Sequence, residues 1–147
     1  MPELDQFAQD LHQEVLVKCA DDASPQMRED AFTECVLERL AEYNEADNAE
    51  TICPSLRWDS RGRFPAAKIN AWALSGDGAT LDLFVTLYHG TGQPDVVSKP
   101  DVAKYFSLAR GFLRRAIDGF YTQLEESHDG LALKKRAVRS SHLVSCL

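Results

Sequence analysis

One carboxylate, Asp82 in the stretch LDLFVTLYHG, is the first residue of this sequence that could do chemistry. The stretch alternates apolar and polar side chains, as a half-buried β-strand does, so Asp82 lies near the start of an extended segment. A carboxylate in that position can hold a divalent cation such as Mg²⁺, which prefers oxygen ligands. It can equally be a surface charge at a strand end, paired across the sheet with Lys68. Both interpretations stay open.

Three arginines in the segment RWDSRGRF indicate a second kind of chemistry. Arg57, Arg61 and Arg63 are interleaved with Trp58 and Phe64. Arginines can bind phosphates and aromatic rings can stack on bases, so the segment could contact a nucleic-acid backbone. The alternative is a solvated, flexible loop, because surface arginines need no ligand.

The charge distribution argues against a general polyanion binder but leaves room for a local anion site. The formal net charge is -7, and residues 1–55 hold 14 Asp and Glu against 3 Lys and Arg, whereas residues 56–147 hold 9 against 13. A sequence-independent grip on nucleic acid normally comes from a basic surface or stripe. An acidic first third joined to a basic remainder is compatible with anion binding only at a local patch.

Missing patterns argue against several functional classes. The sequence contains no phosphate-binding glycine loop, serine nucleophile elbow, H-E-x-x-H or EF-hand pattern. Its acidic N-terminus lacks the apolar core of a secretory signal, and no apolar run is long enough to span a bilayer. We therefore expect a soluble, cytoplasmic protein without a membrane partner.

Two helices are predicted before the first strand. Apolar residues at helical spacing predict the first helix over residues 4–20. Ser24 followed by Pro25 is typical of a helix start, with a capping hydroxyl and a proline at the first helical position. The second helix therefore begins at Pro25 and includes the carboxylate of Glu34.

A long third helix gives the strongest periodic signal. Ser98 is its expected cap, and apolar residues then recur at steps of three or four as far as Leu124. Arg110, Arg114 and Arg115 fall on its polar face, which is typical of solvent-exposed charge.

A β-hairpin is predicted between the second and third helices. Residues 68–74 and 80–89 flank the turn-rich spacer SGDGA, whose glycines permit positive φ. Both faces of the second strand carry large apolar groups, so we expect helices on at least one side of the sheet. Residues 44–67 give no clear pattern beyond possible extended structure near SLRWDS.

The predicted fold is one α/β (α+β) domain over residues 4–124, with a small sheet centred on the hairpin and flanked by helices. A chain of 147 residues with 44% hydrophobic residues is the right size for one core. Beyond this domain the periodicity stops, and residues 125–147 are expected to form a basic, mobile tail.

The order of these elements, together with the motifs FTECVLERL, KINAWAL and LDLFVTLYH, resembles the N-terminal region of the AIPR family, the abortive phage infection proteins. The resemblance covers roughly residues 4–124. It implies a nuclease-like domain of the restriction-endonuclease type, attached in longer proteins to further domains. It also implies a role in antiviral defence.

The resemblance further implies a Mg²⁺ site beside a scissile phosphate, built from a helix Glu, an acid on one hairpin strand and a Glu-x-Lys on the next. Glu34, Asn70 and Asp82 are the matching positions, with Glu34 and Asp82 as metal ligands. Phe84 stands where the lysine should be. Lys68 could supply the missing cation if it points to the same face as Asn70 and Asp82. A solvated helix carboxylate is the alternative for Glu34.

Two functions follow as hypotheses. The first is a phage-defence domain that binds nucleic acid and could cleave it with Mg²⁺. The second is a catalytically inactive interaction or oligomerisation module of the same fold, which docks a second copy or further domains of a longer protein. Trp72, Phe84 and Tyr88 would form its contact surface if exposed.

Overall fold

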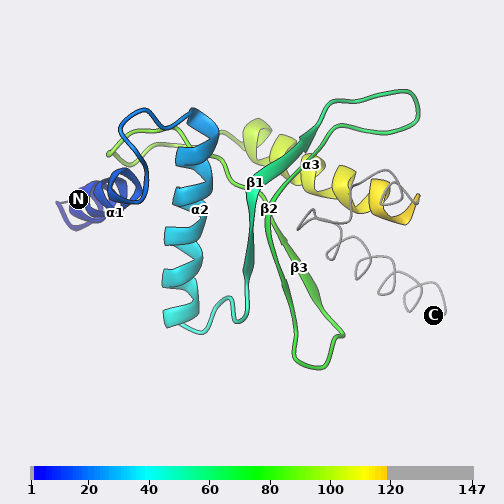
Figure 1. The fold of residues 1–147 in the computed structure, drawn as a ribbon, viewed down its shortest axis with the longest axis horizontal. Coiled ribbons are helices and arrows are strands. Elements are labelled where there is room, and N and C mark those ends of the chain that lie inside the picture. The colour runs from blue at the N-terminus through cyan, green and yellow to red at the C-terminus, as the bar shows by residue number, and fades with distance from the viewer. Residues whose placement is uncertain (1, 119–147) are drawn as a thin grey trace.

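The computed structural model describes residues 2–118, which form an α+β fold with helices on both sides of a three-stranded antiparallel sheet (Figure 1). The helices are α1 (Pro2–Lys18), α2 (Pro25–Glu42) and α3 (Lys99–Ile117), and the strands are β1 (Glu50–Trp58), β2 (Ala67–Leu74) and β3 (Leu81–Phe84). The predicted fold class is therefore confirmed. The predicted tail, residues 125–147, and the predicted end of the third helix at Leu124 lie outside the described residues.

Both predicted helix caps are confirmed. The hydroxyl of Ser24 accepts a hydrogen bond from the backbone N–H of Met27 at 3.2 Å, and Pro25 opens α2. The hydroxyl of Ser98 accepts from the N–H of Asp101 at 3.2 Å. Each cap satisfies a backbone donor that has no partner within its helix.

None of the described helices is long and apolar enough to cross a membrane.

The predicted hairpin is also confirmed, but its second strand is shorter than expected. β2 pairs antiparallel with β3 from Leu74 opposite Leu81 to Ala71 opposite Phe84. Beyond Phe84 the backbone of Thr86 bonds to side chains of β2 instead of its backbone. Its N–H donates to the Asn70 side chain at 2.8 Å, and its carbonyl accepts from the Lys68 ammonium at 2.9 Å. Side chains thus replace the strand ladder at this point.

β1 lies within residues 44–67, which show no clear pattern in the sequence. Thr51 lies opposite Ala71 and Leu56 lies opposite Ile69, so residues 52–55 face a single residue of β2. Pro54 lies within this irregular stretch, and proline cannot donate a ladder hydrogen bond. Beyond β1, the connection to β2 projects past the sheet (Figure 1).

Helices cover the two faces of the sheet, as predicted. On one face Phe112 of α3 packs with Ile69 and Trp72. On the other face Leu37 of α2 packs with Ala71, and Phe84 lies against them. Trp72 is only 3% exposed, so it is not part of the external contact surface that the interaction hypothesis requires.

α3 approaches the backbone at the start of β2 closely at Gly111. A Cβ atom at this position would overlap the backbone carbonyl oxygen of Ala66 and would lie 3.0 Å from its carbonyl carbon. The absence of a side chain therefore allows the helix to approach the strand backbone directly.

Candidate polar cluster and anion-binding cleft

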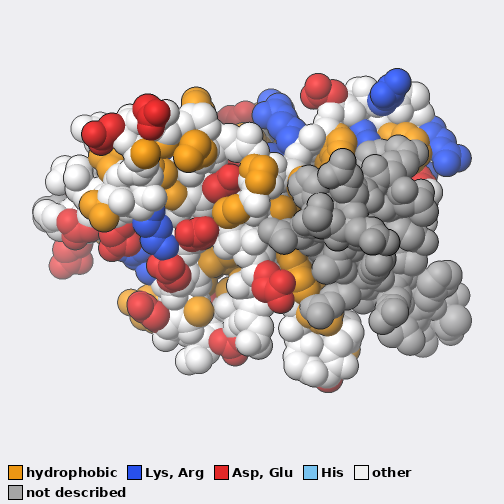
Figure 2. Space-filling model, viewed as in Figure 1, with side chains coloured by type: hydrophobic (Ala, Val, Ile, Leu, Met, Phe, Trp, Pro, Cys, Tyr) orange, Lys and Arg blue, Asp and Glu red, His pale blue; other side chains and the backbone are white. Residues whose placement is uncertain are grey.

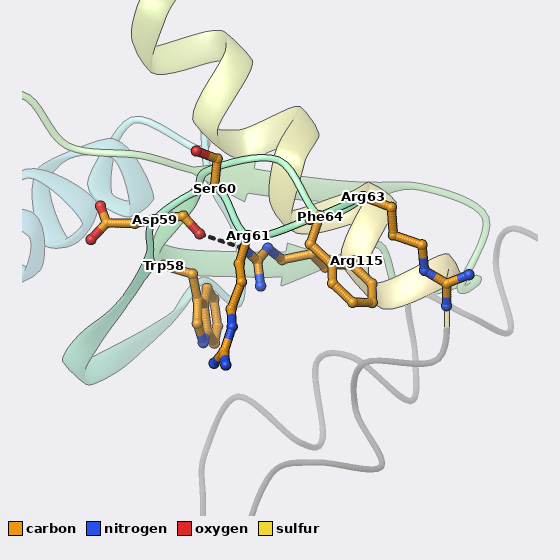
Figure 3. A pocket seen from close by; sticks show the side chains of 8 residues that line it. Trp58, Asp59, Ser60, Arg61, Arg63, Phe64 and Arg115 are labelled. Atoms are coloured by element: carbon orange, nitrogen blue, oxygen red, sulfur yellow. Dashed lines mark hydrogen bonds between the residues drawn. The ribbon is translucent and has the colours of Figure 1, made fainter.

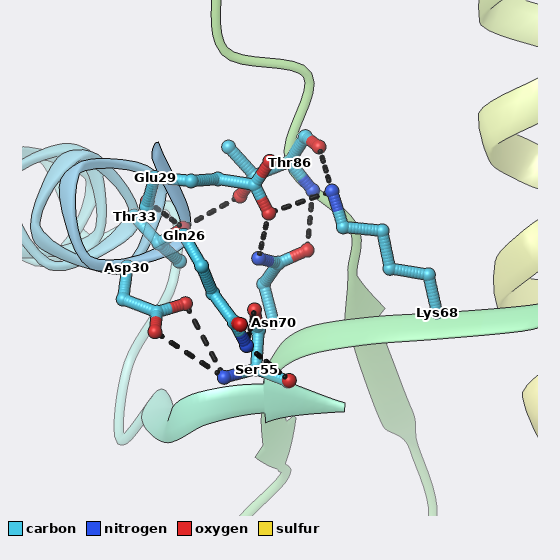
Figure 4. A network of polar contacts seen from close by, with 8 residues as sticks. All are labelled: Gln26, Glu29, Asp30, Thr33, Ser55, Lys68, Asn70 and Thr86. Atoms are coloured by element: carbon cyan, nitrogen blue, oxygen red, sulfur yellow. Dashed lines mark hydrogen bonds and ion pairs between the residues drawn. The ribbon is translucent and has the colours of Figure 1, made fainter. Parts of the chain in front are cut away.

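A buried polar cluster joins α2 to the central strand (Figure 4). The ammonium of Lys68 lies 2.6 Å from Oε1 of Glu29 and donates to the carbonyl of Thr86. The amide of Asn70 donates to the same Glu29 oxygen at 2.8 Å, while its own oxygen accepts from the N–H of Thr86. Lys68 is 5% exposed and Asn70 is fully buried. Buried polar groups need such partners, and these are paired.

Further polar groups of α2 continue the cluster along the helix. The hydroxyl of Thr33 donates to the carbonyl of Glu29 and lies 2.7 Å from the hydroxyl of Thr86. The carboxylate of Asp30 accepts from the N–H of Ser55 at 3.3 Å through both oxygens. The first half of α2 therefore presents polar groups to the irregular part of the sheet, where backbone donors need acceptors.

The structure brings together only two of the residues that were predicted to form a catalytic site. Lys68 and Asn70 point to the same side of β2 and meet at Glu29. Glu34 lies elsewhere: its carboxylate accepts from the thiol of Cys53 at 3.5 Å and lies 3.6 Å from the ammonium of Lys18. The four proposed catalytic residues therefore do not form one set in the described part of the chain.

Asp82 is also separated from this cluster. It is exposed and lies opposite Ala73, three residues along β2 from Asn70, which is a distance of about 10 Å in a strand. The alternative expectation that Asp82 pairs with Lys68 is wrong, because Lys68 pairs with Glu29.

Glu29 is the carboxylate that sequence reasoning missed. The signal for it is helical phase: polar residues precede the apolar stripe of α2 at the same three- and four-residue steps. The residues in this phase are Glu29, Thr33, Leu37 and Leu40. Polar side chains in phase with an apolar stripe face inward, so they need polar partners.

The cluster does not fit a Mg²⁺ site. Oε1 of Glu29 already binds Lys68 and Asn70, and the neighbouring Asp30 directs both carboxylate oxygens at Ser55. Within residues 2–118 no group of three or more His, Cys, Asp or Glu side chains could hold a metal ion. Mg²⁺ is usually held by one or two carboxylates with room for several waters. Glu34 and Asp82 stay predicted ligands: Glu34 accepts from Cys53 and lies near Lys18, and Asp82 is exposed.

A cleft of about 580 Å³ opens beside the cluster, and we call it the Arg28 cleft. Its charged lining groups are Arg28, Glu29, Arg57 and Lys68, so cations outnumber the carboxylate. Tyr88 also lines this cleft. An excess of positive charge in a concave site favours anions.

A second concave surface of about 720 Å³ lies at the connection between β1 and β2, which we call the arginine tip (residues 58–64; Figure 3). Arg61 and Arg63 are exposed there, and Arg57 is exposed near the end of β1. Backbone hydrogen bonds between Arg61 and Phe64, at 2.9 and 3.0 Å, close the turn.

Arg115 of α3 holds the arginine tip in place. Its guanidinium donates to the carbonyls of Pro65 at 2.8 Å and Asp59 at 2.7 Å. It lies over the rings of Trp58 and Phe64, at 5.8 and 5.4 Å from their centroids. The expectation that Arg115 is solvated on a polar helix face is wrong: it is 3% exposed, and burial lowers its pKa. The tip is therefore fixed to the domain and is not a free loop.

Replacing Asp30 by asparagine tests the electrostatics of the cluster. Burial raises the pKa of the Asp30 carboxyl above its ordinary value of 3.8, and the hydrogen bonds from Ser55 only partly offset this. The folded state therefore binds the proton more tightly than the unfolded chain. The contribution of Asp30 to stability is largest below pH 3.8 and is lost as the pH rises through the higher pKa of the folded state. Asparagine can still accept from Ser55 but carries no charge.

We expect Asp30→Asn to raise the free energy of unfolding at pH 7 and to leave it nearly unchanged at pH 3, where both side chains are neutral. Urea denaturation at the two pH values measures this difference. Asp82→Asn, at an exposed position, serves as the control. A variant that is less stable than the wild type at pH 7 would contradict the expectation.

The family model described as the abortive infection phage resistance protein N-terminal domain matches residues 32–143. The match includes the arginine tip, Lys68 and Asn70, and it begins three residues after Glu29. No curated protein and no solved structure matches the chain.

Proposed function

The chain belongs to the family of the abortive infection phage resistance protein N-terminal domain, and we propose that it serves phage resistance by binding nucleic acid. The observation that supports the proposal is the arginine tip: two exposed arginines on a turn that a buried arginine fixes to α3. Arginines of this kind contact phosphates without reading sequence.

The rigidity of the tip strengthens this proposal. A flexible arginine loop loses conformational entropy when it binds, whereas a pre-ordered one loses less. Arg115 bonds to the backbone on both sides of the turn, and the turn closes on itself between Arg61 and Phe64. Arg61 and Arg63 are therefore held in position before any ligand arrives.

The charge on the surface is consistent with a local binding patch. In the space-filling view, Asp and Glu predominate over α1 and α2, and most of the visible Lys and Arg lie at the end that carries α3 and the β1–β2 connection (Figure 2). A polyanion would be repelled from the first end and attracted to the second.

We propose binding without cleavage for this domain. Cleavage with Mg²⁺ needs a carboxylate set that can hold the ion beside the phosphate, and Glu29 is already engaged by Lys68 and Asn70. The catalytic site predicted from the sequence combines Glu34, Lys68, Asn70 and Asp82. It stays a prediction, and adding Mg²⁺ or Mn²⁺ to the samples of the binding measurement tests for cleavage.

We expect the double variant Arg61→Ala, Arg63→Ala to bind DNA or RNA about tenfold more weakly than the wild type at low salt. The slope of log affinity against log salt concentration should become shallower by about 1–2, because two phosphate contacts are lost. Fluorescence anisotropy with labelled single- and double-stranded DNA and RNA measures both quantities.

The matched control is Lys99→Ala, Lys104→Ala, which removes the same charge from exposed positions on α3. Equal weakening in both double variants would show that the affinity depends on net charge and not on the arginines of the tip. Incubation of the same oligonucleotides with Mg²⁺ or Mn²⁺ tests cleavage. Cutting by the wild type that disappears in Glu29→Gln would contradict the proposal of binding alone.

The alternative function is an interaction or oligomerisation module. It predicts no binding of any oligonucleotide and a molecular mass that rises with protein concentration. Light scattering on the wild type at several concentrations separates the two functions.

A further inference from the structure

The Arg28 cleft contains two buried polar groups that lack partners in the described part of the chain. Nε of Arg28 and the hydroxyl of Tyr88 are buried and make no hydrogen bond. Buried polar groups are almost always bonded, so a pair of unbonded donors in one cleft calls for a ligand that accepts hydrogen bonds.

Arg28 and Tyr88 interact electrostatically. Burial raises the pKa of the Tyr88 phenol, and the positive charge of Arg28 partly offsets this rise. Both residues line the same cleft as Arg57.

The position of Arg28 on its helix is electrostatically unfavourable without an anion. It lies in the first turn of α2, whose cap is Ser24. The partial positive charge at a helix N-terminus repels a cation and attracts an anion. In the described part of the chain the Nε of Arg28 makes no hydrogen bond.

The net charge of the cleft comes from two arginines. Lys68 is neutralised by Glu29 at 2.6 Å, which leaves Arg28 and Arg57 as the cations in excess. A guanidinium presents parallel N–H donors that match the oxygens of a phosphate.

From these observations we propose that the Arg28 cleft binds a phosphate group of nucleic acid, with Arg28 and Tyr88 donating to its oxygens and Arg57 adding charge. This inference deepens the proposed function and rests on it, because the phosphate is taken to belong to a nucleic acid bound at the adjacent arginine tip. Arg57 leads from the cleft toward the tip along β1.

Titration calorimetry of inorganic phosphate into the full chain tests this site. Arg28→Met removes the guanidinium, and Tyr88→Phe removes only the hydroxyl. Neither the Nε of Arg28 nor the hydroxyl of Tyr88 makes a hydrogen bond within residues 2–118, so we expect both variants to fold. We expect phosphate affinity to fall by about tenfold or more in Arg28→Met and by about fivefold in Tyr88→Phe, since a hydrogen bond to a charged group is lost. Lys99→Met, which removes one exposed charge, should bind like the wild type.

Oligonucleotides with and without a 5′-phosphate identify the source of the phosphate. Preference for the phosphorylated form that is lost in Arg28→Met assigns a terminal phosphate to the cleft. Equal binding of the two forms, weakened alike in Arg28→Met, assigns a phosphate within the backbone.

The site is overturned if inorganic phosphate does not bind the wild type, or if Arg28→Met binds it equally well. Its failure is distinguishable from failure of the proposed function. If oligonucleotide binding depends on Arg61 and Arg63 but not on Arg28, the proposed phosphate site is wrong and the proposed function stands. If the protein binds phosphate but no oligonucleotide, the proposed nucleic-acid function is wrong.

Discussion

Replacing Gly111 by alanine should destabilise the domain by about 3 kcal/mol or more, although alanine is the better helix former. In a solvent-exposed helix the same change would stabilise by about 1 kcal/mol. Here the added Cβ would overlap the carbonyl oxygen of Ala66, so α3 must move away from β2. That movement would open the contact of the fully buried Phe112 and Ala116 with the sheet. Overpacking typically costs about 1–3 kcal/mol and occasionally more, and an overlap with a backbone atom lies at the upper end of this range.

The measurement is urea denaturation of the wild type and Gly111→Ala, followed by intrinsic tryptophan fluorescence. Gly76→Ala is the matched control, because a Cβ at Gly76 meets nothing within 4 Å. We expect the control to stay within about 0.5 kcal/mol of the wild type. A stabilised Gly111→Ala variant would show that α3 does not approach β2 as closely as described.

Lys68→Met should destabilise the domain by about 3–5 kcal/mol. The methionine fills a similar space but leaves the Glu29 carboxylate, whose side chain is 19% exposed, without its cation. It also removes the donor to the carbonyl of Thr86. Breaking one partner of a buried ion pair leaves an uncompensated charge, which is the costly outcome. Denaturation at pH 7 measures the loss, with Lys99→Met as an exposed control.

A double variant separates the ion pair from the packing. In Lys68→Met, Glu29→Gln the charge is gone from both sides, and glutamine can still accept from Asn70. We expect the double variant to be more stable than Lys68→Met, because paired removal of buried charges is often close to neutral. If the effects of the two single changes simply add, the two residues are not coupled and the polar cluster is misassigned.

Local signals in the sequence predicted the elements that depend on local chemistry. The caps at Ser24 and Ser98 need only a hydroxyl and the next few residues, and the hairpin needs only two strands and the turn between them. The caps lie where they were predicted, and the hairpin differs only in its second strand, which ends earlier, at Phe84. β1 has no clear signal in the sequence, because Pro54 and a four-residue irregularity disrupt its alternation of apolar and polar residues.

The polar cluster could be predicted only in part. Lys68 and Asn70 were expected to share a face, and they do. The prediction of Glu34 does not match the observed contacts, because α2 carries several carboxylates and the sequence does not show which turn of the helix lies over β2. Five residues on a helix correspond to about 7.5 Å of rise and a different face.

Strand register explains the separation of Asp82. Its position relative to Asn70 depends on where the turn at residues 75–79 closes, and a shift of the turn moves every cross-strand pair. Thr86 adds a contact that no strand pattern contains, because its backbone bonds to side chains of β2.

The burial of β2 has a consequence for how natural variation in this domain should be interpreted. β2 is the central strand, and all of its residues except Leu74 are buried. Substitutions there would be removed by selection for folding alone, including those at Lys68 and Asn70, whose polar groups are tied to Glu29 and Thr86. Invariance of these two positions among relatives would therefore not mark an active site. Evolutionary constraint becomes informative about function only at exposed positions such as Arg61 and Arg63, where the fold tolerates change.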